Sequence, residues 1–372
     1  MSDLETSWLP LEEEPNGIPV EELVDARDAA TLAGNPLEAA KYEWRLARTL
    51  YQTGQANAAL PTLDSVHDRF QALGETLWVA RCLALRGVIL SELDHHEAAM
   101  RSLDEAWLGF LEAGDLLDEA SFDFAWGRAL AGMGDYTEAL RKYVGALDGA
   151  IEAHDPQLAS TASYAIGETL SLLGRHSEAL QFVKGACTGY ATLKNSVQAA
   201  RADRFAAHLL MTIGQRKDAV THFEAAFEGF LTTACHRDAA ETARELGRLL
   251  ADLGTRHMDP EASRSALENL RAAMNGFRAL GMNSSVAGCE RDIAETLVDL
   301  GAIELDRQHI EAALPHFEAA VYQFASAGQP LSATAAARRL AYALELLDRE
   351  VNTDAVLHAA FGEAIEDDNA VA

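Results

Sequence analysis

The sequence predicts an all-α solenoid of about eight antiparallel helix pairs. Similar turn motifs recur at intervals of 40 residues or a multiple of it: GQANAAL at 54–60, GDYTEAL at 134–140 and GRHSEAL at 174–180. Between the turns, as in 115–133, apolar residues follow the spacing of an amphipathic helix. Columns of small and of aromatic residues keep the same period. A helical unit repeated in this way buries its apolar face by stacking on its neighbours.

Three columns of residues define the unit. A small residue stands seven positions before each turn: Ala47, Gly87, Gly127, Gly167, Ala207, Gly247, Ala294 and Ala341. An alanine follows each turn: Ala59, Ala99, Ala139, Ala179, Ala219, Ala266, Ala313 and Ala355. An aromatic residue closes most units: Phe70, Phe110, Tyr190, Phe230, Phe277 and Phe324. The small residues allow paired helices to approach more closely than the usual interaxial distance of about 8–10 Å.

These columns place the elements in order along one continuous domain. We expect a flexible acidic N-terminal tail at 1–18, a capping helix at 19–34, a solenoid over 35–368 and a frayed C-terminus at 369–372. The eight repeats are expected at approximately 35–74, 75–114, 115–154, 155–194, 195–234, 235–281, 282–328 and 329–368. Helix starts are predicted at Asn35-Pro36, Asp155-Pro156 and Asp259-Pro260, because each pairs an N-cap residue with a proline at the first helical position.

Two of the repeats are longer than the rest. They gain seven residues after Gly254 and after Gly301, which raises the period from 40 to 47. Seven residues are close to two helical turns, with about 20° of drift, so the insertion keeps the buried face in place. The Asp259-Pro260 pair predicts that the first insertion lengthens a turn. The segment AIELDRQHIEAAL at 302–314 predicts that the second lengthens a helix.

Composition restricts the possible partners. The chain carries 58 acidic and 30 basic residues, a formal net charge of −28, which repels nucleic acid and anionic lipid. No run approaches the roughly 18 apolar residues of a membrane helix, and the N-terminus lacks a signal-peptide pattern. The four cysteines lie far apart and form no CxxC pair. We expect a cytoplasmic protein that binds neither nucleic acid nor membrane, and the Arg- and Ala-rich composition hints at a GC-rich bacterial genome.

One stretch, SELDHHEAAM at 91–100, gathers enough ionisable residues to suggest chemistry. The repeat places Asp94 where other units have the turn glycine, so His95 and His96 fall in a turn. A metal site needs three or four converging ligands, and none accompany them. GMG at 132–134 follows a helix and lacks the lysine of a phosphate-binding loop. We expect no catalytic, metal or cofactor site, and a protein that is not an enzyme.

The unit resembles the tetratricopeptide repeat. The family pattern of a small residue, a later Ala, an aromatic and another Ala fits Gly127, Ala139, Tyr143 and Ala146. The unit departs from the family because it has 40 residues instead of about 34, has Asp123 where Trp is common and lacks the closing Pro. This length is similar to the long-helix subclass of kinesin light chains, spindle-orientation adaptors and bacterial regulators. The resemblance covers roughly 19–366 and implies a right-handed superhelix.

The resemblance also implies a concave groove, lined by the first helix of each repeat at positions three before and one after the small residue. The first of these columns reads Trp44, Ala84, Phe124, Tyr164, Arg204, Arg244, Arg291 and Arg338. The second contributes Arg48, Arg128, His208 and Arg248, and Arg81 marks the share of the second repeat. The aromatic members would anchor apolar groups, and the arginine ladder would hold carboxylates.

Two interpretations of these columns stay open. In the first, the arginines bind a ligand. In the second, the arginines form ion pairs within the chain with Glu168, Glu241, Glu295 and neighbouring acidic residues. In this interpretation Trp44 and Phe124 belong to the core.

The function expected first is a protein–protein interaction scaffold or adaptor that holds an extended peptide or partner helix with acidic groups. The alternative is a peptide-responsive regulator, resembling bacterial quorum-sensing receptors but lacking a DNA-binding domain, and an enzyme ranks last. The acidic tail is a candidate occupant of the same groove.

Overall fold

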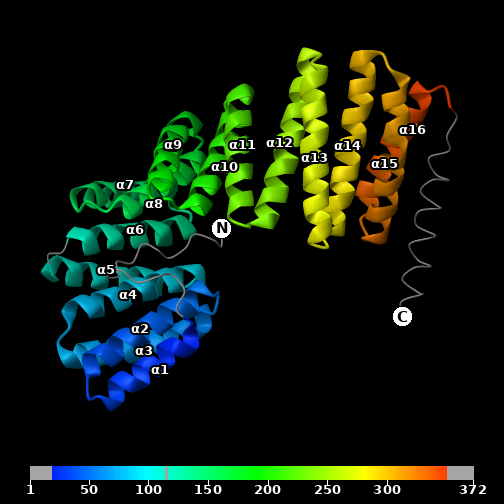
Figure 1. The fold of residues 1–372 in the computed structure, drawn as a ribbon. Coiled ribbons are helices and arrows are strands. Elements are labelled where there is room, and N and C mark those ends of the chain that lie inside the picture. Colours follow the sequence, from blue (N-terminus) through cyan, green and yellow to red (C-terminus); the bar gives the residue numbers. More distant parts are fainter. Residues whose placement is uncertain (1–18, 114–115, 350–372) are drawn as a thin grey trace, which may run out of the picture. The chain divides into compact units, whose positions relative to one another are not determined.

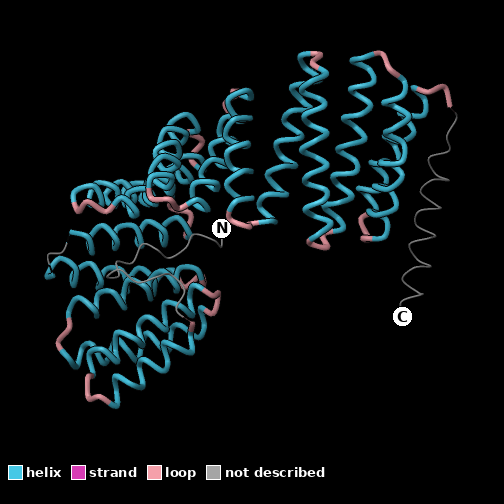
Figure 2. Tube along the Cα trace, viewed as in Figure 1, coloured by secondary structure: helices cyan, strands magenta, loops and turns pink. Residues whose placement is uncertain are grey.

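The computed structural model describes residues 19–113 and 116–349 and shows the predicted all-α architecture (Figures 1 and 2). Within these ranges the chain forms sixteen helices in sequential antiparallel pairs, joined by short turns. By its internal contacts the chain divides into two compact units, Met1–Lys194 and Asn195–Ala372. The proposed tail at 1–18, the second helix of the last repeat and the C-terminus lie outside the described residues.

Unit 1 begins with the single helix α1, and each later pair stacks on the one before it. Its helices are α1 (Val20–Leu32), α2 (Pro36–Gln52), α3 (Ala56–Leu73), α4 (Thr76–Glu92), α5 (His96–Ala113), α6 (Leu116–Gly132), α7 (Tyr136–Glu152), α8 (Pro156–Leu172) and α9 (His176–Thr192). The first helices of successive pairs, α2, α4, α6 and α8, contact one another. Side chains of consecutive repeats therefore meet along this row.

Unit 2 continues the same pattern with longer helices at its centre. Its helices are α10 (Ser196–Thr212), α11 (Arg216–Thr232), α12 (His236–His257), α13 (Pro260–Ala279), α14 (Asn283–Glu304), α15 (Arg307–Ser326) and α16 (Pro330–Leu346). Here α12 contacts α14, and α14 contacts α16. No helix in the described ranges is long and apolar enough to cross a membrane.

The three proline-marked helices begin where the sequence predicts. Asn35 accepts a hydrogen bond from the backbone N–H of Glu38 at 3.3 Å, and Asp155 accepts one from Gln157 at 2.9 Å. Asp259 caps α13 in the same way through Glu261 at 3.0 Å. Each cap satisfies an N–H that has no partner within the helix, which contributes about 1 kcal/mol of stability.

The turn between paired helices requires a left-handed backbone. Gly54, Gly134, Gly174 and Gly214 have φ between 75° and 84°, a conformation that costs glycine little. Asp94 holds the corresponding position with φ 61°, as the repeat alignment predicts, and His96 starts α5. The connector is therefore residues 93–95, because Ser91 and Glu92 end α4 and His96, which we expected in the turn, is the first residue of α5. The described residues hold no group of three or more His, Cys, Asp or Glu arranged to bind a metal.

The small-residue column holds the two helices of a pair together. A Cβ added at Gly87 would lie 2.6 Å from Leu103 Cγ, and one at Gly127 would lie 2.8 Å from the Tyr143 ring. Contacts this short leave no room for a methyl group. The column and the alanine column thus face each other across the interface between the first and second helix.

Both seven-residue insertions lengthen helices. The helices α12 and α14 have 22 residues, against 17 in α10. The expectation that the first insertion lengthens a turn is wrong, because only Met258 and Asp259 separate α12 from α13. A heptad keeps the apolar stripe in register, so continuing the helix buries more surface than a loop would. Met258 and Leu305 take over the left-handed turn position, with φ 52° and 56°.

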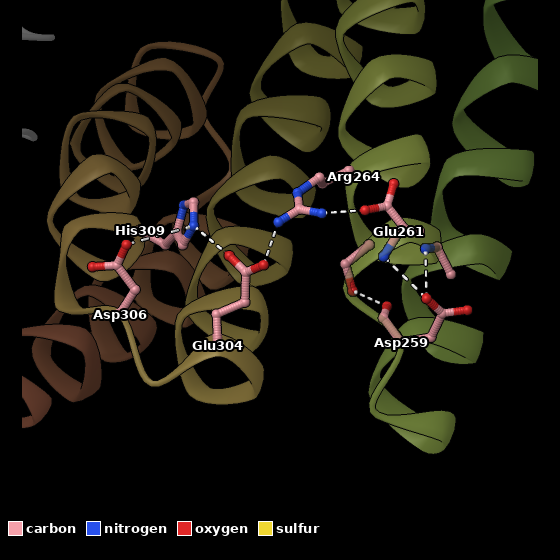
Figure 3. A network of polar contacts seen from close by, with 8 residues as sticks. Asp259, Glu261, Arg264, Glu304, Asp306 and His309 are labelled. Carbon is pink, nitrogen blue, oxygen red and sulfur yellow. Dashed lines mark hydrogen bonds and ion pairs between the residues drawn. The ribbon is translucent and has the colours of Figure 1, made fainter.

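A polar network joins the two lengthened repeats near the ends of α12 and α14 (Figure 3). Arg264 of α13 contacts Glu261 in its own helix and Glu304 at the end of α14. His309 Nε2 lies 2.8 Å from the same Glu304 carboxylate. Because these groups are partly exposed, each pair contributes at most about 1 kcal/mol.

Candidate functional site

Two of the predicted aromatic anchors lie in the core of unit 1. The side chains of Trp44 and Phe124 are 0% and 1% exposed. Trp44 meets Trp78 edge-on, with 5.5 Å between ring centroids, and Phe124 packs on Tyr143 at 5.3 Å. This burial favours the second interpretation of the aromatic positions, since neither ring presents surface to a ligand. The sequence already indicated core packing, because both residues lie three positions before a member of the small-residue column, on the same side of the helix.

The other aromatic candidate, Tyr164, is half-buried and hydrogen-bonds to Glu168 through its hydroxyl. Burial raises the pKa of the Glu168 carboxyl to about 7, although the charge of Arg128 and the Tyr164 hydrogen bond act in the opposite direction. A carboxyl with this pKa changes its charge near neutral pH. Tyr164 and Glu168 are one helical turn apart on α8, in the two predicted columns.

The cationic side chains at the start of unit 1 stack on tryptophan rings. The Arg81 guanidinium lies 4.5 Å from the Trp78 ring centroid, and that of Arg48 lies 6.0 Å from Trp44. Arg48 is buried, and its burial together with the nearby charge of Arg45 lowers the pKa of Arg48 to about 10. These arginines pack against aromatic faces, an arrangement that stabilises a cation by roughly 0.5–2 kcal/mol.

Arg128 links three consecutive repeats of unit 1. Its guanidinium donates to the Tyr51 hydroxyl at 3.1 Å and to Glu92 at 3.0 Å, and Tyr51 donates to the same carboxylate. Burial alone would lower the pKa of Arg128, but the nearby Tyr51, Glu92 and Tyr143 outweigh it and raise that pKa. Arg128 is thus bound within the chain.

Sequence reasoning missed Tyr51 and Glu92 as partners of Arg128. They stand four and five residues after the small residues Ala47 and Gly87. Extending the predicted columns by one helical turn would have found both positions.

In unit 2 the first members of the arginine ladder pair with acids of the next repeat. Arg204 of α10 lies 3.3 Å from Asp238 and 3.6 Å from Glu241, both on α12. His208 Nε2 lies 3.3 Å from Glu245 of α12. Glu241 is one of the internal partners that the second interpretation expected. These residues connect α10 to α12.

Three arginines of unit 2 share one buried carboxylate. Asp292 of α14 has a side chain that is 4% exposed. Arg244 Nε lies 2.8 Å from Asp292 Oδ2, Arg291 lies 2.9 Å from Oδ1, and Arg248 Nε lies 4.0 Å from Oδ2. Three guanidiniums therefore lie near one carboxylate, Arg291 also interacts with Glu295, and the Arg248 side chain remains 64% exposed. The structure brings these three predicted residues together.

Gly288 makes room for this arrangement. It precedes Asp292 by one helical turn on α14, and a Cβ there would lie 2.5 Å from an Arg244 guanidinium nitrogen. Sequence reasoning missed both Gly288 and Asp292. The sequence pattern that could have indicated them is a pair of four-residue spacings. Arg244 and Arg248 have this spacing on one first helix, and Gly288 and Asp292 have it on the next first helix.

The last member of the ladder is the most accessible. Arg338 of α16 is exposed and forms no ion pair with residues that the structure describes. Its neighbour Arg339 lies 3.4 Å from Glu295. Burial raises the pKa of Glu295, while the charges of Arg291 and Arg339 oppose that rise. The second interpretation expected Glu295 to pair with an arginine of the predicted columns. In the structure its ion pair is with the neighbouring residue Arg339.

Comparisons with known proteins agree with the fold. Residues 118–191 match the sequence model of the tetratricopeptide repeat. A search of curated protein sequences found no match.

Among solved structures, a STAND ATPase with a tetratricopeptide repeat sensor from Pyrococcus horikoshii has 14% identity and a TM-score of 0.58, over 77% of this chain and 43% of its own. RapI has 12% identity and a TM-score of 0.52, over 74% of this chain and 97% of its own. Aspartyl phosphate phosphatase F from Bacillus subtilis has 12% identity and a TM-score of 0.51, over 96% and 95%. At these identities the likeness concerns the fold.

Proposed function

We propose that this chain, a tetratricopeptide repeat protein, is a scaffold or adaptor that binds an acidic segment of a partner protein. The repeats of this fold stack into extended surfaces that bind other proteins. The segment is an extended peptide or one face of a helix. It lies along the first helices of unit 2, where α12, α14 and α16 carry Arg244, Arg248, Arg291 and Arg338.

The excess of positive charge around Asp292 is the observation that supports this proposal. Three guanidiniums surround one carboxylate, so a second carboxylate is attracted to the same place. Arg248 is exposed and lies 4.0 Å from Asp292, beyond hydrogen-bond distance, so its donors are available to a ligand. A guanidinium binds a carboxylate through two parallel hydrogen bonds, which adds geometric specificity.

The internal ion pairs determine which arginines can contact the ligand directly. Carboxylate partners are already present at Arg204, Arg244 and Arg291. These arginines therefore contribute to ligand binding through the electrostatic field of their charges more than through new hydrogen bonds. Arg248 and Arg338 provide the direct contacts. The chain as a whole is acidic, so attraction is confined to distances below the Debye length of about 10 Å at 0.1 M salt. Binding should therefore depend on local sequence in the partner.

The test uses affinity capture from the native host, followed by mass spectrometry and titration of the captured partner. The variant Arg248→Gln with Arg338→Gln removes the two exposed charges and leaves the Asp292 cluster otherwise intact. We expect this variant to lose partners whose binding segment is acidic. Arg271→Gln, at an exposed position on α13, is the matched control and should retain them. Equal capture by all three proteins would contradict the proposal.

A second candidate, a regulator that changes conformation when a peptide binds, draws support from the division into two compact units. Two units joined in one chain are able to change their arrangement when a ligand favours one arrangement. Small-angle scattering with and without the captured partner separates the candidates. Marked compaction favours the regulator, and an unchanged profile favours the rigid adaptor.

A further inference from the structure

A cavity of about 450 Å³ lies in unit 2 between α14 and α15, with α13 at its edge. Its lining consists of Arg278, Asn283, Val286, Tyr322, Gln323, Ser326 and Ala327. Cavities of about 300–1,000 Å³ hold small-molecule ligands. Most of the lining belongs to the second helices, α13 and α15, whereas the arginine ladder belongs to the first helices. The cavity is therefore separate from the proposed partner surface.

A glycine column brings the two helices of five other pairs into close contact. In five earlier repeats the residue before the aromatic column is glycine, and it faces a small residue of the first helix: Gly109 faces Ala80, Gly149 faces Ala120, Gly189 faces Ser160, Gly229 faces Ala200 and Gly276 faces Ala240. A Cβ added at Gly109 or Gly229 would lie 2.8 Å from the alanine Cβ. The helices of these pairs are in contact at this point, and no larger residue fits.

In the seventh repeat Gln323 replaces this glycine. It stands 47 residues after Gly276, and Ala287 stands 47 residues after Ala240, so Gln323 of α15 faces Ala287 of α14. A glutamine side chain is larger than the spacing of the glycine pairs admits, so the Gln323 side chain contributes to the lining of the cavity instead. The first repeat has Arg69 at this position, and its side chain pairs with the buried Glu43 at 2.9 Å. Gln323 instead lines the cavity.

The polar groups of the cavity have incomplete partners. Gln323 Oε1 is buried and has no hydrogen-bond partner among the described residues. A buried acceptor without a donor destabilises the folded protein, and a ligand that donates to it removes this cost. The Arg278 guanidinium lies 3.6 Å from Glu290 and 3.4 Å from Asn275, and both contacts are long. A guanidinium has five N–H donors, so Arg278 can bind a further anionic group at the cavity edge beside its contact with Glu290.

We propose that this cavity binds a small anionic metabolite. A carboxylate or phosphate of the ligand lies against Arg278, and an ammonium or hydroxyl group of the ligand donates to Gln323 Oε1. Amino acids with an acidic or phosphorylated side chain carry both an anionic group and an ammonium donor. The ligand would make unit 2 responsive to a small molecule, independently of any protein partner.

The test is calorimetric titration of the full chain with glutamate, phosphoserine and inorganic phosphate. We expect binding of at least one amino acid probe, and weaker binding of inorganic phosphate, which lacks the donor at the far end. Arg278→Gln should weaken binding at least tenfold, the effect of losing roughly one charge-assisted hydrogen bond. Arg271→Gln, on the same helix and outside the cavity, should bind as the wild type does.

A second variant, Gln323→Gly, introduces the residue found in five earlier pairs. The variant removes the Oε1 acceptor and should abolish binding, while the melting temperature of the unliganded protein falls only by the small cost of a glycine within a helix. A loss of binding with a stable fold separates this result from unfolding. No binding of any probe to the wild type, or equal binding by the wild type, Arg278→Gln and Gln323→Gly, would overturn the proposal.

Discussion

Arg244 Nε lies 2.8 Å from Asp292 Oδ2, and the guanidinium rests on the backbone of Gly288 one helical turn earlier. This contact joins α12 to α14, the lengthened first helices of two consecutive repeats. Asp292 is almost completely buried and also forms an ion pair with Arg291. The same carboxylate therefore holds two repeats together and neutralises part of the arginine ladder.

Asp292→Asn should have opposite effects on stability and on binding. Removing the carboxylate leaves three guanidiniums without their shared partner, which lowers the free energy of unfolding by about 1–3 kcal/mol. The same change removes the internal competitor and tightens the binding of an acidic peptide. Urea denaturation and peptide titration measure the two effects. If affinity falls together with stability, Asp292 has only a structural role.

Gly288→Ala should destabilise the wild type but stabilise the Asp292→Asn variant. Alanine has a helix propensity about 1 kcal/mol better than that of glycine. In the wild type its Cβ displaces the Arg244 guanidinium, so the ion pair with Asp292 is lost. A double-mutant cycle measured by urea denaturation gives the coupling, which we expect to exceed about 0.5 kcal/mol. A coupling near zero would show that Arg244 relocates without cost.

Leu305→Gly should stabilise the protein. Leu305 is 91% exposed and has φ 56°, a left-handed conformation that costs a residue with a Cβ about 1–2 kcal/mol. Glycine avoids this cost but loses about 0.5–1 kcal/mol through the entropy of the unfolded chain. We expect a net gain of roughly 0.5 kcal/mol in thermal unfolding. Leu305→Ala keeps the Cβ and should show no gain, and an equal gain in both variants would point to removal of exposed leucine surface instead.

Glu168→Gln should change the pH dependence of stability. Burial raises the pKa of Glu168 from 4.5 to about 7, so the folded state holds a proton that the unfolded state has released. Between these values the wild type loses stability as pH rises, and above pH 7 the loss is complete. The variant lacks this loss, so its advantage should be absent near pH 4.5 and reach about 3 kcal/mol at pH 8, since one pKa unit corresponds to about 1.4 kcal/mol. Urea denaturation across this range measures the difference, and a pH-independent difference would contradict it.

The repeat period was sufficient to predict the helices. The small residues Gly87 and Gly127 and the turn position of Asp94 recur at fixed spacing, and each acts on its own helix or on the next one. Signals of this kind are local in the sequence. The first insertion was placed wrongly because Asp259-Pro260 marks a helix start equally well after a long turn or after a lengthened helix.

The partners of the arginines could not be predicted in the same way. Asp292 is 48 residues from Arg244, and Tyr51 is 77 residues from Arg128. Whether such side chains meet depends on the rotation of one first helix against the next, which no periodic pattern specifies. The burial of Trp44 has the same origin, because the same column is exposed at Arg338.

The central claim is that the arginines of unit 2 bind an acidic segment, and one titration tests it most directly. A glutamate-rich peptide and its glutamine-substituted counterpart are titrated into the wild type, Asp292→Asn and Arg248→Gln at about 50 mM and about 300 mM salt. We predict that only the glutamate peptide binds, more tightly to Asp292→Asn, more weakly to Arg248→Gln and more weakly at the higher salt concentration. Equal affinity for the two peptides, unchanged by either substitution, would contradict the claim.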